Sequence, residues 1–283
     1  MINDDEIKNI YGHLEKRYGN KEDPWGLDLR KSKKSVKLAA LLYKKYFNVR
    51  VFGQENIIDD RPLLVVANHS GQLPYDAMLT SLAFMLEIKP PRILRAMIER
   101  FVTSLPFCNT FFAENGAVLG DRNNALHLLK RGESLLVFPE GVRGVSKSRS
   151  EYYELQSFTR GFFRLALQTG VDILPVSIVG AEEFFPFVYH PKKLAKSLGL
   201  PAIPFTPMFP GIFGPLGPIP LPSPIDIYID KIYSLPANLE PQSPDKYIDE
   251  HVYEIENIIR DRIKFGVENR RTYWGSIFAK RKL

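Results

Sequence analysis

The sequence predicts an α/β fold: a mainly parallel sheet flanked by helices, with an N-terminal helical elaboration. Short runs rich in Val, Ile and Leu alternate along the chain with segments of helical periodicity, which is the order expected of a parallel sheet with crossover helices. The apolar runs are continuous, as expected for strands buried on both faces. At 283 residues, the chain can bury a sizeable core, either as one large domain or as a domain with an elaboration.

Composition and charge narrow the class of protein. Hydrophobic residues make up 45% and charged residues 25% of the chain, which is ordinary for a globular protein. The single cysteine, Cys108, allows no internal disulfide and fits a reducing compartment. The net charge of +6 suggests an anionic partner: nucleic acid, an acidic membrane surface or a phosphorylated substrate. The acidic N-terminus does not resemble a signal peptide, and no apolar run is long enough to predict a membrane-spanning helix.

Residues 1–47 are predicted to form the N-terminal basic helical elaboration. Residues 4–18 have the pattern of a short polar helix. Residues 30–47 carry seven lysines and arginines and no acidic residue, with apolar side chains at helical spacing. A basic amphipathic helix of this kind can lie on an anionic membrane surface. Alternatively, its charges form the solvated face of an ordinary packed helix.

Residues 48–283 are predicted to form the main domain. Strands are expected at residues 48–52, 63–67, 92–98, 117–119, 134–138, 172–179 and 225–233. Helices are expected at residues 76–86, 123–130 and 159–169 and after Ser243. The segment 225–233 alternates apolar and polar residues, which predicts a strand exposed on one face.

Two segments of the main domain depart from this pattern. Residues 198–224 form a Pro-rich apolar insertion without any charge, which excludes a regular helix or a central strand. The insertion either packs over the core as a lid or exposes an apolar patch to lipid, and the two are compatible. The basic C-terminal tail, residues 260–283, has interleaved aromatic residues, a composition that suits a membrane interface or nucleic acid.

The most informative stretch joins the strand at residues 63–67 to the following helix. The strand stops before His69, Gly71 and Pro74 mark a turn, and Asp76 begins the helix. In α/β sheets, ligands bind at the carboxyl ends of the strands. A histidine there can act as a base, and a nearby carboxylate can orient its ring and stabilise the imidazolium ion. The alternative is a capped turn whose histidine only bonds to the backbone.

A second junction with the same organisation follows the strand at residues 134–138. Glu140 can accept hydrogen bonds from a hydroxyl group, and Arg143 and Lys147 can hold a phosphate. Gly141 allows backbone N–H groups to approach an anion. Taken alone, this motif would be interpreted as a turn with a surface ion pair, but two such turns after two core strands favour a functional site.

These motifs resemble the glycerolipid acyltransferase superfamily, which includes lysophosphatidate acyltransferases. The resemblance covers roughly residues 48–234 and rests on four blocks in order. The blocks are Asn68-His69-Ser70 with Pro74 and Asp76, Asn115-Gly116-Ala117-Val118-Leu119-Gly120-Asp121-Arg122, Phe138-Pro139-Glu140-Gly141-Val142-Arg143 and Ile173-Leu174-Pro175-Val176-Ser177. The aspartate lies two residues further from the histidine than is usual in the superfamily. This form resembles the subgroup related to monoacylglycerol and diacylglycerol acyltransferases.

The resemblance implies a glycerol-phosphate acyltransferase-like fold and a transferase that moves a fatty acyl group from an acyl thioester to a glycerolipid or lysophospholipid hydroxyl. His69 is then the general base, oriented by Asp76. Backbone donors near Ser70 and Gly71 are expected to hold the oxyanion. The residues implied to bind substrate are Glu140, Gly141, Arg143, Arg122, Ser70 and Gly71.

The same resemblance implies acyl-CoA or acyl carrier protein as the donor substrate, no cofactor, and a peripheral enzyme on the cytoplasmic face of an anionic membrane. The segment 30–45, the insertion and the basic tail are expected to face the bilayer together. No histidine has a partner at metal-ligand spacing, so no metal is expected. No recognition motif supports nucleic acid as a partner. The alternative function is a catalytically inactive lipid-binding member of the same fold.

Overall fold

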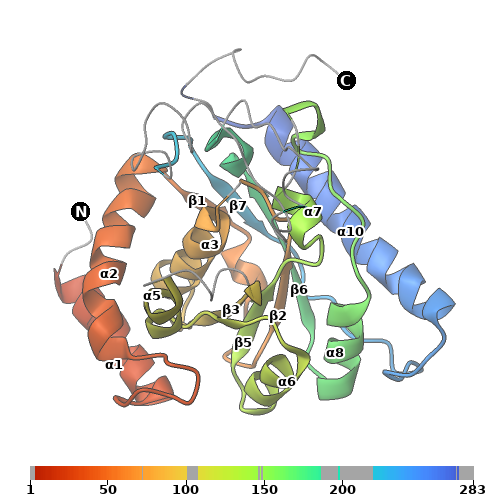
Figure 1. Cartoon of the computed structure of the whole chain (residues 1–283), viewed down its shortest axis with the longest axis horizontal. Coiled ribbons are helices and arrows are strands. Elements are labelled where there is room, and N and C mark those ends of the chain that lie inside the picture. Colours follow the sequence, from red (N-terminus) through yellow and green to blue (C-terminus); the bar gives the residue numbers. More distant parts are fainter. Residues whose placement is uncertain are drawn as a thin grey trace.

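The computed structural model describes residues 4–71, 73–100, 108–145, 147, 149–185, 197, 219–271 and 273. Within them, seven strands form one sheet in the order β1-β7-β6-β2-β5-β3-β4, with helices on both faces (Figure 1). The strands are β1 (Arg50–Phe52), β2 (Leu64–Ala67), β3 (Leu94–Ile98), β4 (Val118–Leu119), β5 (Ser134–Val137), β6 (Ile173–Val179) and β7 (Asp226–Ile229). The expected mainly parallel sheet flanked by helices is therefore confirmed.

The helices divide between the two faces of the sheet. They are α1 (Asp4–Tyr18), α2 (Leu29–Leu41) with a π-helical turn (Leu42–Tyr46), α3 (Tyr75–Leu86), α5 (Cys108–Glu114), α6 (Arg122–Lys130), α7 (Val142–Val145), α8 (Gly161–Thr169) and α10 (Asp245–Glu268). In β2, Val65 and Ala67 belong to the apolar cluster that contains residues of α1, α2 and α3. Leu64 and Val66 belong to the cluster formed with α6, α8 and α10. Alternate residues of one strand thus enter opposite cores.

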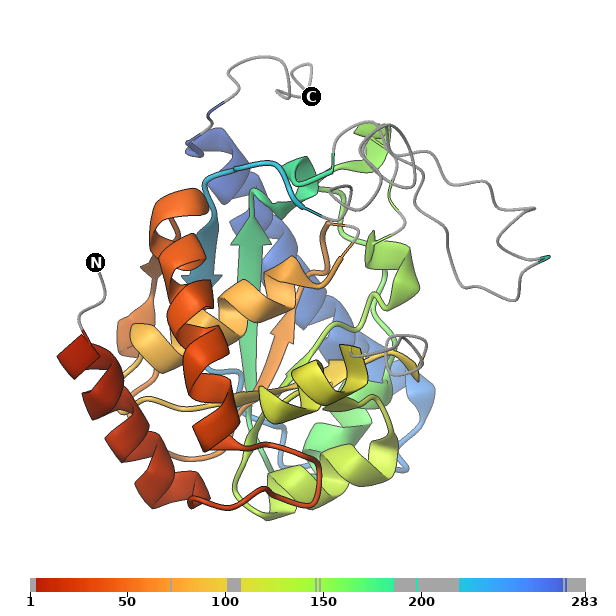
Figure 2. The same ribbon diagram turned by 60° about the vertical axis from the view of Figure 1, so that its left-hand side comes forward.

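The N-terminal helices expected from the sequence are present, and α1 and α2 lie side by side (Figure 2). Their buried residues Ile7, Leu14 and Val36 join the same apolar cluster as β2. The boundary at residues 47 and 48 stays a prediction. Among the described residues, none of the helices is long and apolar enough to cross a bilayer.

The strand order brings three loops to one edge of the sheet. β2 pairs in parallel with β5 on one side and with β6 on the other, so the carboxyl ends of all three strands point the same way. The loops that follow begin at Asn68, Phe138 and Gly180. Residues that are distant in sequence therefore meet at this edge.

The expectation that residues 225–233 form a strand exposed on one face is wrong. All four residues of β7 are buried, because the strand lies between β1 and β6 and α10 packs over its outer face, with Gly266 against Tyr228. The polar positions are neutralised rather than solvated: the Asp226 carboxylate pairs with Arg50 at 2.7 Å and with Arg271 at 3.0 Å. The alternation of apolar and polar residues in this strand therefore arises from ion pairs inside the protein and does not indicate exposure to solvent.

Candidate active site

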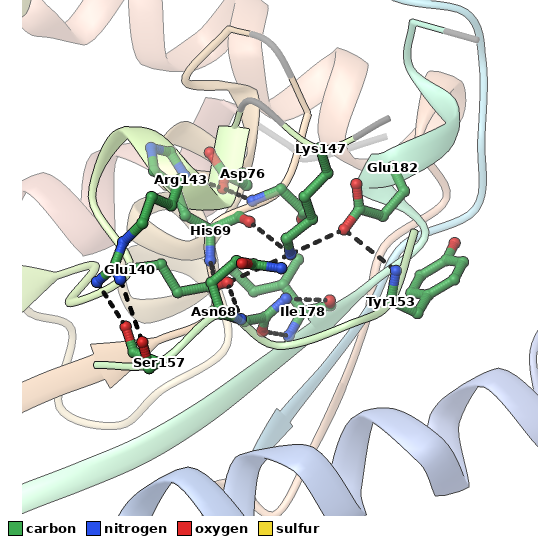
Figure 3. A network of polar contacts seen from close by, with 12 residues as sticks. Asn68, His69, Asp76, Glu140, Arg143, Lys147, Tyr153, Ser157, Ile178 and Glu182 are labelled. Atoms are coloured by element: carbon green, nitrogen blue, oxygen red, sulfur yellow. Dashed lines mark hydrogen bonds and ion pairs between the residues drawn. The ribbon is translucent and has the colours of Figure 1, made fainter. Parts of the chain in front are cut away.

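The end of β2 and the start of α3 bring an imidazole and a carboxylate into direct contact (Figure 3). Nδ1 of His69 lies 2.6 Å from Oδ2 of Asp76. An ionised carboxylate only accepts hydrogen bonds, so Nδ1 carries the proton and Nε2 keeps its lone pair. Although the two residues are seven positions apart, they make the contact that the sequence predicted. The His69 side chain is 18% exposed.

Asp76 also organises the turn between the strand and the helix. Its fully buried carboxylate accepts hydrogen bonds from the Ser70 N–H at 2.9 Å and from the Ala77 N–H at 2.8 Å. The Ser70 N–H is thus occupied in this structure. Gly71 has a positive φ of 79° and lies against the Ala181 carbonyl. The oxyanion contact expected of Ser70 and Gly71 stays a prediction.

The surroundings of His69 act on its pKa in opposite directions. Burial lowers the pKa, but the charge and hydrogen bond of Asp76, together with the charge of Glu140, outweigh this effect and raise the pKa above its ordinary value. The imidazole ring stacks on Phe138, with ring centroids 4.2 Å apart. A histidine held by a carboxylate, with a perturbed pKa, is typical of a general base.

Glu140, expected to contact substrate, has its carboxylate inside the protein. Oε1 accepts the His69 N–H at 2.7 Å, and Oε2 accepts the Gln156 N–H at 2.7 Å. Gly141 forms the tight turn just after Glu140, with its N–H donating to the Phe138 carbonyl at 2.9 Å. In this structure, Glu140 therefore fixes the backbone of the histidine.

The three cations proposed from the sequence lie in different environments. Arg143 is exposed beside the His69 cluster, and its guanidinium donates to Oγ and the carbonyl oxygen of Ser157 at 3.1 and 2.8 Å (Figure 3). Lys147 is buried. Arg122 begins α6 and donates to Oε1 of Gln168 on α8 at 2.9 Å. None of the contacts described for Arg122 joins it to His69, and its role as an anion contact stays a prediction.

Two residues to which the sequence argument gave no role hold the site together. The Asn68 side-chain amide donates to the Ile178 carbonyl at 3.0 Å and accepts the Ile178 N–H at 2.7 Å, which joins the end of β2 to β6. Glu182 follows β6 and is buried beside Lys147. Like His69 and Glu140, it lies in a glycine-containing turn directly after a buried strand, so the sequence did contain a signal. Among the described residues, no group of His, Cys, Asp and Glu is arranged to hold a metal ion.

Gly144 allows α7 to lie directly on the His69 residue. A Cβ at position 144 would stand 2.7 Å from Cβ of His69 and 3.0 Å from its carbonyl oxygen. We expect Gly144→Ala to displace His69 and to lower the free energy of unfolding by about 1–3 kcal/mol, as overpacking does. Thermal unfolding should show a lowered Tm, and the imidazole NMR signals of His69 should shift. Gly161→Ala is the matched control, because a Cβ there meets nothing within 4 Å; equal Tm changes in the two variants would contradict the prediction.

Comparison with known proteins adds a family and several relatives. Residues 48–179 match the family described as Acyltransferase. An uncharacterized protein of Mycobacterium tuberculosis is 40% identical over 203 residues, which are 71% of this chain and 56% of that protein. The human protein named DGAT1/2-independent enzyme synthesizing storage lipids is 28% identical over 57% of this chain and 49% of its own. The 1-acyl-sn-glycerol-3-phosphate acyltransferase of Borreliella burgdorferi is 26% identical over 48% of this chain and 52% of its own.

The fold also has a match among solved structures. The crystal structure of the 1-acyl-sn-glycerophosphate (LPA) acyltransferase PlsC from Thermotoga maritima superimposes with a TM-score of 0.53 at 21% identity, covering 91% of each chain. This likeness shows the fold. The chain spans about half the length of the relatives it matches by sequence.

Proposed function

Since this chain belongs to the glycerolipid acyltransferase superfamily, we propose that it transfers a fatty acyl group from an acyl thioester to a hydroxyl of a glycerolipid or lysophospholipid. The observation that carries the proposal is the 2.6 Å contact between Nδ1 of His69 and Asp76. This contact leaves Nε2 as the proton acceptor at the carboxyl edge of the sheet. Asp76 then stabilises the imidazolium ion that forms during the reaction.

The proposed reaction needs one histidine and no acyl-enzyme. Nε2 of His69 removes the proton of the acceptor hydroxyl, and the oxygen attacks the thioester carbonyl. The carbon–oxygen bond of the new ester forms while the carbon–sulfur bond breaks, and the imidazolium returns its proton to the departing thiolate. Arg143, exposed beside the histidine, supplies a guanidinium for a phosphate group of either substrate.

The names of two relatives indicate which acceptors to test. The Borreliella relative is named as a 1-acyl-sn-glycerol-3-phosphate acyltransferase and the human relative as an enzyme that synthesizes storage lipids, so lysophospholipid and neutral glycerolipid acceptors both belong in a test. Acyl-CoA and acyl carrier protein are the two donors to compare. We propose no cofactor for the transfer, because the histidine supplies the base and the thioester is already activated.

The direct test is a thiol-release assay with labelled acyl-CoA, followed by thin-layer chromatography of products from a panel of acceptors. Acceptor-dependent thiol release and a labelled lipid product are the expected results. The alternative function is a lipid-binding member of the fold without turnover. That alternative gains support if the chain binds the lipids but releases no thiol with any donor and acceptor.

We further propose a peripheral location on the cytoplasmic face of a membrane. Several basic residues of α2 and the π-helical turn are engaged within the protein: Lys37 pairs with Asp4 at 2.5 Å and Lys44 with Glu6 at 3.9 Å. The remaining outward face supports the proposal, because Leu38 is 64% exposed and lies in a row of exposed leucines and lysines. The insertion 198–224 and the basic tail 260–283 were expected to join this surface, and residues 198–218, 272 and 274–283 of these two segments lie outside the described residues.

The exposed row on α2 and the π-helical turn consists of Lys34, Leu38, Leu41 and Lys45. Its residues recur at helical spacing, so two leucines lie between two lysines on one face. A buried leucine contributes about 1.5–3 kcal/mol, and each lysine near an anionic surface contributes about 1 kcal/mol. This combination is the composition of an interfacial helix.

We expect the double variant Leu38→Glu/Leu41→Glu to lose binding to vesicles containing anionic lipid in a flotation assay. Wild-type binding should rise with the fraction of anionic lipid and fall with salt. The matched control is Ile58→Glu, which changes another exposed apolar residue, 79% accessible, outside the row. Similar losses in the two variants, or binding that is indifferent to salt, would count against this surface.

A further inference from the structure

Lys147 is a buried cation with a complete set of partners. Its side chain is 2% exposed, and Nζ lies 3.2 Å from Oε1 of Glu182, 3.4 Å from Oε2 of Glu140 and 3.3 Å from the carbonyl oxygen of His69. An ammonium group has three protons to donate, so these contacts use its full capacity. No donor is left for a substrate phosphate, which was one role that the sequence allowed.

The three partners of Lys147 come from three different loops at the same edge of the sheet (Figure 3). His69 follows β2, Glu140 lies beyond β5, and Glu182 lies beyond β6. These strands are neighbours, with β2 in the middle. One ammonium group therefore joins the loops on both sides of the histidine to the histidine itself.

The peptide groups of His69 are held on both sides of its Cα atom. Its N–H donates to Oε1 of Glu140 at 2.7 Å, and its carbonyl accepts from Nζ of Lys147. These two contacts fix the backbone from which the imidazole ring projects, while Asp76 fixes the ring. A charged pair that holds both ends of one residue is a strong restraint, because charge-assisted hydrogen bonds exceed neutral ones in strength.

We propose that Lys147, together with Glu182, is a positioning device that sets the place of the His69 imidazole without touching substrate. Only the expected effect of this device on turnover rests on the proposed function. The restraint on His69 exists whether or not the chain transfers acyl groups. Glu182 takes part by accepting from the ammonium group at 3.2 Å, and it receives a further hydrogen bond from the Tyr153 N–H at 3.4 Å.

The charges that face His69 are Asp76, Glu140 and Lys147, and they give the device a spectroscopic signature. Asp76 and Glu140 raise the pKa of His69, whereas Lys147 lowers it. Removing the lysine charge should therefore raise the pKa of His69 further. A lysine that acted only by binding a substrate phosphate would instead change KM for phosphorylated substrates.

The test uses Lys147→Met, which keeps the length of the side chain and removes the ammonium group. We expect kcat to fall by roughly 10²-fold, the size of effect that a misplaced catalytic group produces, with KM for donor and acceptor unchanged. Imidazole NMR of labelled chain, with His69 assigned by its absence in His69→Ala, should show a higher pKa. A normal kcat with a normal His69 titration, or a change confined to KM, would overturn the proposal.

A second variant keeps the test decisive if Lys147→Met does not fold. The wild-type cluster of Lys147, Glu140 and Glu182 carries one net negative charge, and Lys147→Met/Glu182→Gln carries the same net charge. The double variant should fold and still show a lowered kcat and a displaced His69 signal, because the contact to the His69 carbonyl is missing. If it regains wild-type kcat and titration, the lysine serves charge balance alone and the positioning role is wrong. If wild-type chain shows no turnover, the proposed function fails, whereas the NMR comparison still decides the positioning role.

Discussion

Replacing His69 with alanine is expected to abolish acyl transfer while the chain stays folded. Nε2 is the atom proposed to take the proton of the acceptor hydroxyl, and loss of a general base costs about 10²–10⁴-fold in rate. The fold should survive, because the contacts of His69 with Glu140 and Lys147 are made by its main chain and persist in alanine. The stacking of the ring on Phe138 is the packing that is lost.

The measurement is single-turnover thiol release alongside a thermal unfolding curve. His127→Ala is a suitable control, since His127 lies exposed on α6, and it should leave the rate unchanged. A His69→Ala chain that is folded and still transfers at more than about a tenth of the wild-type rate would contradict the role of a general base.

Much of the fold could be predicted because its signals are local. β2, β5 and β6 are short apolar runs that end at turn residues, and those signals are contained within a few adjacent positions. β7 was predicted as a strand but with the wrong exposure. Asp226 resembles a solvated residue until Arg50 is known to lie beside it, and that partner is 176 residues away.

The candidate site also contains features that could be predicted and features that could not. The proximity of His69 and Asp76 could be predicted, because one strand-to-helix junction carries both. The burial or exposure of the charged residues on the second turn could not be predicted. Arg143 and Lys147 are both cations within four positions of each other, yet Arg143 is exposed and Lys147 is buried. The difference depends on Glu182, which lies 35 residues beyond Lys147 and reaches it only through the pairing of β2 with β6.

The basic residues of segment 30–47 show that surface charge, too, depends on partners that are distant in sequence. Its seven charges predict a cationic helix face, but the structure pairs Lys37 and Lys44 with acids of α1. What remains outward is the row of Lys34, Leu38, Leu41 and Lys45. The number of basic residues in this segment therefore overstates the charge that is available to a membrane.

Asp76→Asn is expected to lower the rate by roughly 10²–10⁴-fold through the state of His69 rather than by unfolding. The oxygen of the introduced amide can still accept from the Ala77 N–H, so the start of α3 keeps its contact. The amide carries no charge, so it no longer stabilises the imidazolium ion that forms when the base takes its proton. An amide can also donate a hydrogen bond to Nδ1, which would place the proton on Nε2 and remove the base.

The pH dependence of Asp76→Asn distinguishes an effect on the protonation of His69 from an effect on the structure of the turn. In the wild-type chain, the pKa of His69 is raised above 6.5, and the base must be neutral, so kcat/KM should fall as the pH drops through that raised value. Without the Asp76 charge, burial becomes the dominant influence and lowers the pKa of His69. The acidic limb of kcat/KM should therefore move to lower pH even as the maximal rate falls. If the limb stays in place while the rate drops, the titrating group is not His69, and Asp76 acts on the rate by holding the turn alone.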